Sequence, residues 1–264
     1  MTTISLSLDG IGQAAGLIAD AYRRLKVLDA LPSDCQPATF AEAVAIQDEV
    51  ARRLAIPVVG WKLGHANEAM RTKFGEGAPV IGRLFDGSVL ASPAVIPQDQ
   101  INQPLVEGEW AVRLGADLPP RDRPYDLDEV AAAIEAVMPA IEFAEVRTRQ
   151  TPSLLELTAL NAGAFRLILG AEVSDWRKVR LNDLAAELRL DGHVVATQYT
   201  GAERSDPLWA LWYLANDLSK RGIGLRRGEV VSTGVILPYL PLGEASEAVL
   251  SVAGVGEARL EIAR

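Results

Sequence analysis

Val106-Glu107-Gly108-Glu109-Trp110 places two acidic residues inside an apolar run that is typical of a strand over residues 105–114. Side chains alternate along a strand, so Glu107 and Glu109 point to the same face. Two carboxylates this close repel each other unless a cation lies between them, and Mg²⁺ or Mn²⁺ takes oxygen ligands of this kind. The spacing alone also fits a solvated strand face, which is the more common case.

A third acid, Glu142, lies in the apolar stretch Met138-Pro139-Ala140-Ile141-Glu142-Phe143. Burying a lone carboxylate is costly unless it is paired or bound to a metal. Metal ligation and an ion pair with Arg147 or Arg113 therefore both explain this residue. We take the three acids together as candidate metal ligands.

Lys62 lies in Val58-Val59-Gly60-Trp61-Lys62-Leu63-Gly64, a short strand between glycines. A buried lysine loses its charge or needs an acidic partner, and either makes it usable in acid–base chemistry or as a substrate anchor. The alternative is a lysine that snorkels at a strand end. His65 is a candidate for ligand contact only because it neighbours Lys62, and it is a weaker candidate than Lys62. His193 is expected in an exposed turn, and the two histidines do not make a zinc pattern.

Composition narrows the class of protein. The chain has 264 residues, of which 49% are hydrophobic and 23% charged, so it can bury a large core. It carries 26 basic and 35 acidic residues, for a net charge of −9, and lacks a basic run with interleaved aromatics. We therefore expect no nucleic-acid partner. The single cysteine, Cys35, excludes an internal disulfide. No apolar run approaches the ~18 residues of a membrane span and no secretory leader is evident, so we expect a soluble cytoplasmic protein without a membrane partner.

The order of elements predicts the fold class. Apolar spacing predicts a helix that Pro32 stops and a second helix over 40–54, which begins with a Thr39–Glu42 capping box. After residue 57, strand-like runs outnumber the two further predicted helices, 128–138 and the one that starts near Pro207. Asp191-Gly192 predicts a hairpin. Strands and helices do not alternate regularly, so we expect an α+β or barrel-like β fold, with a helical N-terminal portion (1–57) and a β-rich domain (58–264).

These stretches together resemble the fumarylacetoacetate hydrolase superfamily, and within it the 2-keto-4-pentenoate hydratase and 4-oxalocrotonate decarboxylase branch. Residues 60–64 are similar to its Gly-aromatic-Lys-aliphatic-Gly strand, and residues 106–109 to its Glu-x-Glu metal strand. Ala140-Ile141-Glu142 resembles the strand that bears its third acidic ligand. Further matches follow in family order at Asn161-Ala162, 207–218, 228–234 and 254–256.

The resemblance implies a mixed β-roll that binds Mg²⁺ or Mn²⁺ on the three acids, with a 2-oxo acid chelating the metal. It implies a homo-oligomer, often pentamer-based, and places Lys62 near the substrate. The residues that we assign to the substrate side are His65, Leu160, Thr233 and Gly234.

The resemblance also implies an activity, namely a metal-dependent hydratase that adds water to a 2-hydroxy-2,4-dienoate in aromatic or steroid catabolism. The alternatives are a 2-oxo acid decarboxylase of the same fold and a non-catalytic partner subunit of such an enzyme. Three positions depart from the branch: Leu160 and Glu145 stand where Asp is usual, and Val235 where a small hydroxyl residue is usual. If Leu160 lines the pocket, we expect it to depress the pKa of Lys62 and to favour an apolar substrate tail. The alternative is that Leu160 is core packing.

Overall fold

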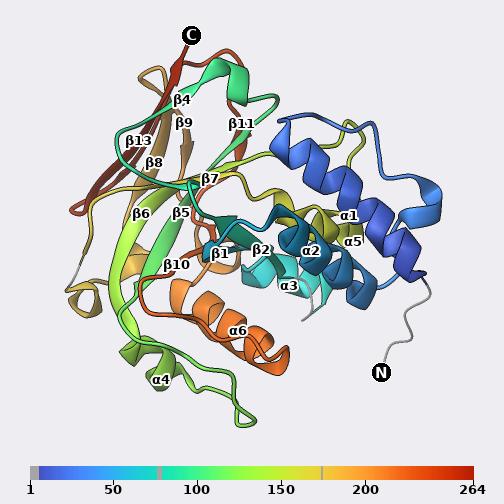
Figure 1. The fold of residues 1–264 in the computed structure, drawn as a ribbon. Coiled ribbons are helices and arrows are strands. Elements are labelled where there is room, and N and C mark those ends of the chain that lie inside the picture. Colours follow the sequence, from blue (N-terminus) through green and yellow to red (C-terminus); the bar gives the residue numbers. More distant parts are fainter. Residues whose placement is uncertain (1–5, 76–78, 174) are drawn as a thin grey trace.

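Two β-sheets form the body of the molecule, and the helices lie to the right of them and below them in the view of Figure 1. The structure is a computed structural model that describes residues 6–75, 79–173 and 175–264. The larger sheet has the order β2-β1-β10-β5-β6-β7-β3, with β11 paired to β5, and the smaller one has the order β4-β13-β12-β8-β9. Both sheets mix parallel and antiparallel pairs, as the expected mixed β-roll of an α+β fold requires.

The strands of the larger sheet are β1 (Val58–Gly64), β2 (Val80–Phe85), β3 (Val89–Ala91), β5 (Leu105–Leu114), β6 (Ile134–Ala144), β7 (Arg166–Leu169), β10 (Val230–Val235) and β11 (Leu240–Pro241). Those of the smaller sheet are β4 (Ala94–Pro97), β8 (Ala186–Leu190), β9 (His193–Thr197), β12 (Glu247–Val252) and β13 (Gly256–Ala263). The α-helices are α1 (Leu8–Arg23), α2 (Phe40–Leu54), α3 (Glu68–Phe74), α4 (Leu127–Ala132), α5 (Leu154–Ala159) and α6 (Pro207–Lys220).

Strand register gathers the candidate residues at the middle of the larger sheet. In the antiparallel pair β5–β6, Glu107 lies opposite Glu142. In the parallel pair β1–β10, Lys62 lies opposite Ser232. Since β10 also pairs with β5, these four residues come from four consecutive strands of one sheet.

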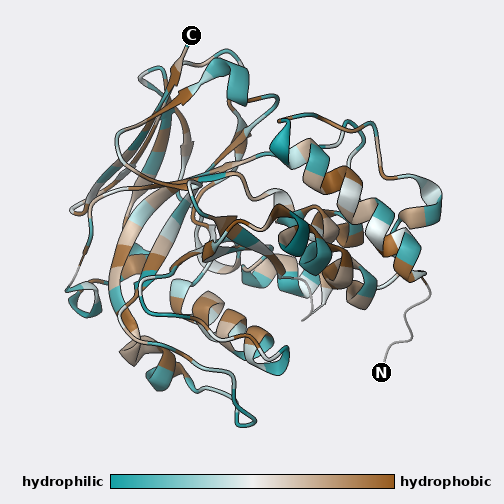
Figure 2. Ribbon diagram, in the orientation of Figure 1, coloured by the Kyte–Doolittle hydropathy of each residue, from teal (hydrophilic) through white to brown (hydrophobic). Residues whose placement is uncertain are grey.

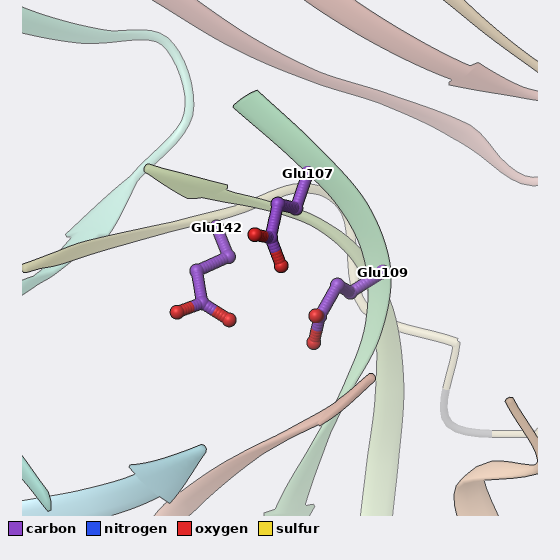
Figure 3. Close-up of side chains that lie close together, drawn as sticks. All are labelled: Glu107, Glu109 and Glu142. Carbon is purple, nitrogen blue, oxygen red and sulfur yellow. The ribbon is translucent and has the colours of Figure 1, made fainter. Parts of the chain in front are cut away.

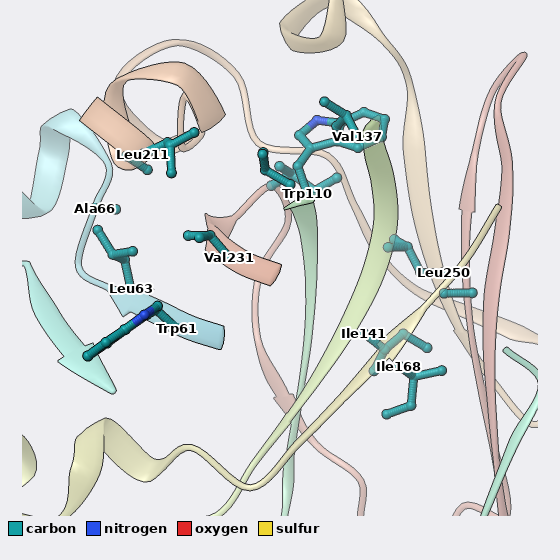
Figure 4. Close-up of a cluster of buried hydrophobic side chains, with 14 of the residues drawn as sticks. Trp61, Leu63, Ala66, Trp110, Val137, Ile141, Ile168, Leu211, Val231 and Leu250 are labelled. Atoms are coloured by element: carbon teal, nitrogen blue, oxygen red, sulfur yellow. The ribbon is translucent and has the colours of Figure 1, made fainter. Parts of the chain in front are cut away.

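The main hydrophobic core lies against the other face of β5. Val106, Trp110 and Val112 alternate with the two acids and belong to this core, which also includes Leu250 of the smaller sheet (Figure 4). Hydrophobic stretches run along the strands, whereas the connections at the periphery are mostly hydrophilic (Figure 2). Burying each large apolar side chain stabilises the fold by about 1.5–3 kcal/mol, so this face fixes the orientation of the acids on the opposite one.

The N-terminal helices form a second apolar cluster beside the sheets. Helices α1 and α2 pack on each other, and α5 joins them (Figure 1). The expected capping box of α2 is confirmed, because Thr39 accepts from the backbone of Glu42 and Glu42 accepts from the backbone of Thr39. The division of the chain at residue 57 stays a prediction. Among the described residues, no helix combines the length and apolar character that a membrane crossing needs.

The helix predicted over 128–138 is wrong in its second half. Helix α4 ends at Ala132, and β6 begins at Ile134. The β-branched residues Ile134 and Val137 pair with β5 instead, so sheet formation overrides the local helical pattern. The Asp191-Gly192 hairpin between β8 and β9 is confirmed, and His193 beside it is exposed as expected.

Candidate metal centre

Three glutamates converge at the centre of the larger sheet. Glu107 and Glu109 project from β5 and Glu142 from β6 toward the same space (Figure 3). One carboxylate oxygen of each lies within 4.8 Å of the others. Glu109 and Glu142 are buried, and Glu107 is half-buried. The structure thus brings together the three acids that the sequence singled out.

Glu109 is held in place by two donors from β10. Its Oε2 accepts hydrogen bonds from the Ser232 hydroxyl and from the Gly234 N–H, the latter at 2.9 Å. Gly234 has φ of +94°, and a Cβ there would lie 2.6 Å from Oγ of Ser205. Only glycine therefore allows this backbone to approach Glu109. None of the described residues donates a hydrogen bond to the other oxygen of Glu109, which can therefore bind a ligand.

Lys62 extends into the cluster from β1. Its Nζ lies 2.8 Å from Oε1 of Glu142 and donates to the Ala162 carbonyl at 3.0 Å. Lys62 is 4% exposed, so the alternative of a snorkelling lysine is wrong. Oε2 of Glu142 has no hydrogen-bond partner among the described residues.

The charges in this cluster do not balance. Burial first, and then the neighbouring Glu142, raise the pKa of Glu107 to about 7. The same two causes raise the pKa of Glu109 well above its usual value. One lysine cannot neutralise three carboxylates, and a buried excess of negative charge is costly. A hard divalent cation supplies the missing charge and accepts the free carboxylate oxygens, so these residues fit Mg²⁺ or Mn²⁺.

Lys62 keeps its proton in this environment. Burial alone would lower the pKa of its ammonium group, but the three carboxylates, Glu142 foremost, outweigh burial and raise that pKa above its usual range. The acids beside Lys62 thus raise its pKa in the metal-free structure. The lowering expected if Leu160 lines the pocket stays a prediction.

The two arginines that could have paired with Glu142 form ion pairs with other acids instead. Arg147 lies 2.7 Å from Glu145, and Arg113 pairs with Glu172. Both arginines lie outside the carboxylate cluster as a result. The cation that Glu142 contacts is Lys62.

Two residues assigned to the substrate side lie close to the cluster. Gly234 contacts Glu109 through its N–H. His65 has φ of +57°, is half-buried and stacks on Phe74 at 5.5 Å, while its Nδ1 has no partner among the described residues. Burial, and then the charge of Lys62, lower the pKa of His65. Its position next to β1 keeps it a candidate for ligand contact.

The other two lie in packed surroundings. The Thr233 hydroxyl donates to the Trp110 carbonyl at 2.7 Å, and Thr233 is fully buried. Leu160 belongs to the cluster of α1, α2 and α5, where it packs near Phe85. Substrate contact by Thr233 and Leu160 stays a prediction.

Sequence reasoning missed two contributors. The Ser232 hydroxyl on Glu109 had no signal beyond its place before Thr233-Gly234, because the bond depends on how β10 pairs with β5. The Ala162 carbonyl on Lys62 is a backbone group, which no side-chain pattern could reveal.

The fold and the carboxylate cluster together define the class of protein. The family model for the fumarylacetoacetate (FAA) hydrolase C-terminal region matches residues 64–263. The chain belongs to this family.

Similar proteins narrow the comparison to one branch. The chain is 30% identical over 224 residues to the 2-keto-4-pentenoate hydratase of Paraburkholderia xenovorans strain LB400. This alignment covers 83% of this chain and 82% of the relative. It is 28% identical over 228 residues to a 4-oxalocrotonate decarboxylase of Pseudomonas putida, with 85% and 86% covered. The solved 4-oxalocrotonate decarboxylase from Pseudomonas putida G7, complexed with magnesium and adipate, has a TM-score of 0.88 at 26% identity and covers 99% of this chain and 100% of its own.

Proposed function

We propose that the chain is a metal-dependent hydratase that converts a 2-hydroxy-2,4-dienoate into a 4-hydroxy-2-oxo acid. The observation that carries this proposal is the convergence of Glu107, Glu109 and Glu142 with the buried Lys62. The similarity to a 2-keto-4-pentenoate hydratase over 83% of the chain supports it.

The carboxylates would hold Mg²⁺ or Mn²⁺, and Ser232 with Gly234 would fix the orientation of Glu109. The metal would act as a Lewis acid toward the carboxylate and 2-oxo oxygens of the substrate. His65 and Gly234 border this space and are proposed to contact the substrate.

The reaction needs one proton transfer and one addition of water. The enol proton leaves the 2-hydroxyl, a proton arrives at the far end of the diene, and an α,β-unsaturated ketone results. Water then adds across the C3–C4 double bond, with its hydroxyl going to C4 and a proton to C3. Lys62 carries a proton beside Glu142, and its Nζ is proposed to orient the substrate or move the proton.

A decarboxylase is the second candidate. The specific observation in its favour is the match to the magnesium- and adipate-bound decarboxylase over 99% of the chain. In that reaction the divalent cation held by the same carboxylates would stabilise the enolate that remains after carbon dioxide leaves.

A product assay separates the two reactions. The purified chain with Mg²⁺ would be given a 2-hydroxy-2,4-dienoate and, separately, a 4-oxalocrotonate-type acid, while proton NMR and carbon dioxide release are followed. We expect the 4-hydroxy-2-oxo acid from the first and no gas from the second. Gas release without hydration would favour the decarboxylase, and no turnover of either would favour a partner subunit.

Two further properties are proposed from the family resemblance. We infer a homo-oligomer, pentamer-based, and a cytoplasmic location. Light scattering on the purified chain would test the first, and a monomer would contradict it.

A further inference from the structure

Three successive residues between α5 and β7 adopt left-handed backbone conformations. Asn161, Ala162 and Gly163 have φ of 57°, 54° and 67°. Non-glycine residues rarely take this conformation, and strained backbone of this kind persists only where surrounding contacts impose it. We call residues 161–163 the left-handed turn.

The Asn161 side chain supplies those contacts. Its Oδ1 accepts from the N–H of Arg83 at 2.7 Å, and its Nδ2 donates to the carbonyl of the same residue at 2.9 Å. Asn161 is 6% exposed, so both bonds form away from solvent. The amide thereby fastens the turn to the backbone of β2.

The turn and β2 both press against Lys62. Gly82 pairs with Lys62 across β1 and β2. A Cβ on Gly82 would lie 2.5 Å from the Asn161 carbonyl oxygen and 2.9 Å from Cγ of Lys62. The Ala162 carbonyl, directed by the left-handed turn, accepts from Lys62 Nζ at 3.0 Å.

We propose that Asn161 is a positioning residue that holds the Ala162 carbonyl on Lys62 and so aims its ammonium group at Glu142 and the substrate. Asparagine suits this role because its short amide tolerates the left-handed conformation and can bond a backbone N–H and carbonyl together. The effect on turnover rests on the function proposed for Lys62. The contact itself does not.

A matched control exists elsewhere in the chain. Asn216 of α6 brackets the N–H and carbonyl of Tyr125 in the same manner, at 2.8 and 3.1 Å, and is 8% exposed. Asn161→Ala and Asn216→Ala each remove such a pair of bonds, and Asn216→Ala also removes a bond from Nδ2 to the Trp212 carbonyl at 3.0 Å. Asn161→Gly removes the bonds while relieving the backbone strain, which keeps the test valid if the alanine variant folds poorly.

The experiment is a double-mutant cycle with Lys62→Met. We expect Asn161→Gly to lower kcat about 10- to 100-fold with KM changed less than about two-fold, because misplacement of one group slows the chemical step. In the Lys62→Met background the same change should cost less than about two-fold, since the residue being positioned is gone. Asn216→Ala should leave kcat within about two-fold in both backgrounds.

The free energy of unfolding is a second readout, and it does not depend on the substrate. Asn161→Gly and Lys62→Met should be non-additive in urea unfolding, whereas Asn216→Ala and Lys62→Met should be additive. If Lys62→Met is fully active, the proposed role of Lys62 fails, and the unfolding cycle alone decides whether Asn161 positions the Ala162 carbonyl on Lys62. The proposal would be overturned if Asn161→Gly and Lys62→Met had additive effects on the free energy of unfolding, or if their separate losses in kcat multiplied in the double variant.

Discussion

Two buried ion pairs lie toward the end of β6, and they are built differently. Lys62 with Glu142 and Arg147 with Glu145 have similar separations, 2.8 and 2.7 Å, and each side chain is at most 8% exposed. Oε1 of Glu145 also accepts backbone N–H groups of the loop that precedes β5. Within the described part of the chain, Glu142 has no such donors and instead faces two more carboxylates.

The difference separates a structural pair from a chemical one. Glu145 is matched by one arginine and two backbone donors, so it ties a loop to the sheet. Glu142 keeps a free oxygen in a cluster with excess negative charge, which a cation can use. The comparison predicts that one pair governs turnover and metal binding, and the other governs stability.

The largest effect is expected on turnover from Lys62→Met. The methionine keeps most of the apolar stem but cannot carry a proton, so turnover should fall about 100-fold or more. With Mg²⁺ the variant should melt near the wild type. With a chelator it should melt at a lower temperature than the wild type, because Glu142 then has neither Lys62 nor the metal ion beside it. Steady-state kinetics and thermal melts check this, with the exposed Lys178→Met as control. Full activity of Lys62→Met would contradict the proposed mechanism.

Arg147→Met should act on stability instead. Removing one partner of a buried pair leaves Glu145 uncompensated, at a cost of about 3–5 kcal/mol in unfolding free energy. Mg²⁺ affinity should be unchanged. Arg149→Met is the matched control, because its pair with Asp29 is largely exposed and is worth about 0–1 kcal/mol. Urea unfolding measures both variants, and equal losses would remove the distinction between buried and exposed pairs.

The smallest expected effect is the pH dependence of stabilisation by Mg²⁺. Glu107 has a pKa of about 7 in the folded chain, above the ordinary value of 4.5, so the metal-free fold binds a proton that the unfolded chain releases. Metal-free stability therefore falls as pH rises toward 7. Mg²⁺ needs the ionised carboxylate, so its increase in Tm should be larger near about pH 8 than near about pH 5.5. An equal increase at both pH values would argue against this cluster as the binding site.

The sequence predicted the acidic residues of the site better than the residues that hold them in place. Alternation along a strand places Glu107 with Glu109, and the cost of a buried acid singles out Glu142, so both follow from local chemistry. The Ser232 bond depends on β10 pairing with β5, where the register shifts after Ser232, and no local pattern encodes that shift. Leu160 shows the same limit, since its sequence neighbours do not reveal that it packs against α1 and α2.

For the fold, too, local signals were predicted correctly and features that depend on strand pairing were not. Segments with caps or turns, such as the helix that begins after Thr39 and the Asp191-Gly192 hairpin, were predicted correctly because their signals are local. The boundary between α4 and β6 was not, because pairing with β5 decides it.

Isothermal titration of Mg²⁺ tests the central claim most directly, namely that Glu107, Glu109 and Glu142 bind one divalent cation. The wild-type chain should bind a single equivalent, and Glu109→Ala should weaken the affinity at least about ten-fold. Glu145→Gln, three residues from Glu142 but in the structural pair, should bind as the wild type does. Unchanged Mg²⁺ affinity in Glu109→Ala, or no binding to the wild type, would contradict the account.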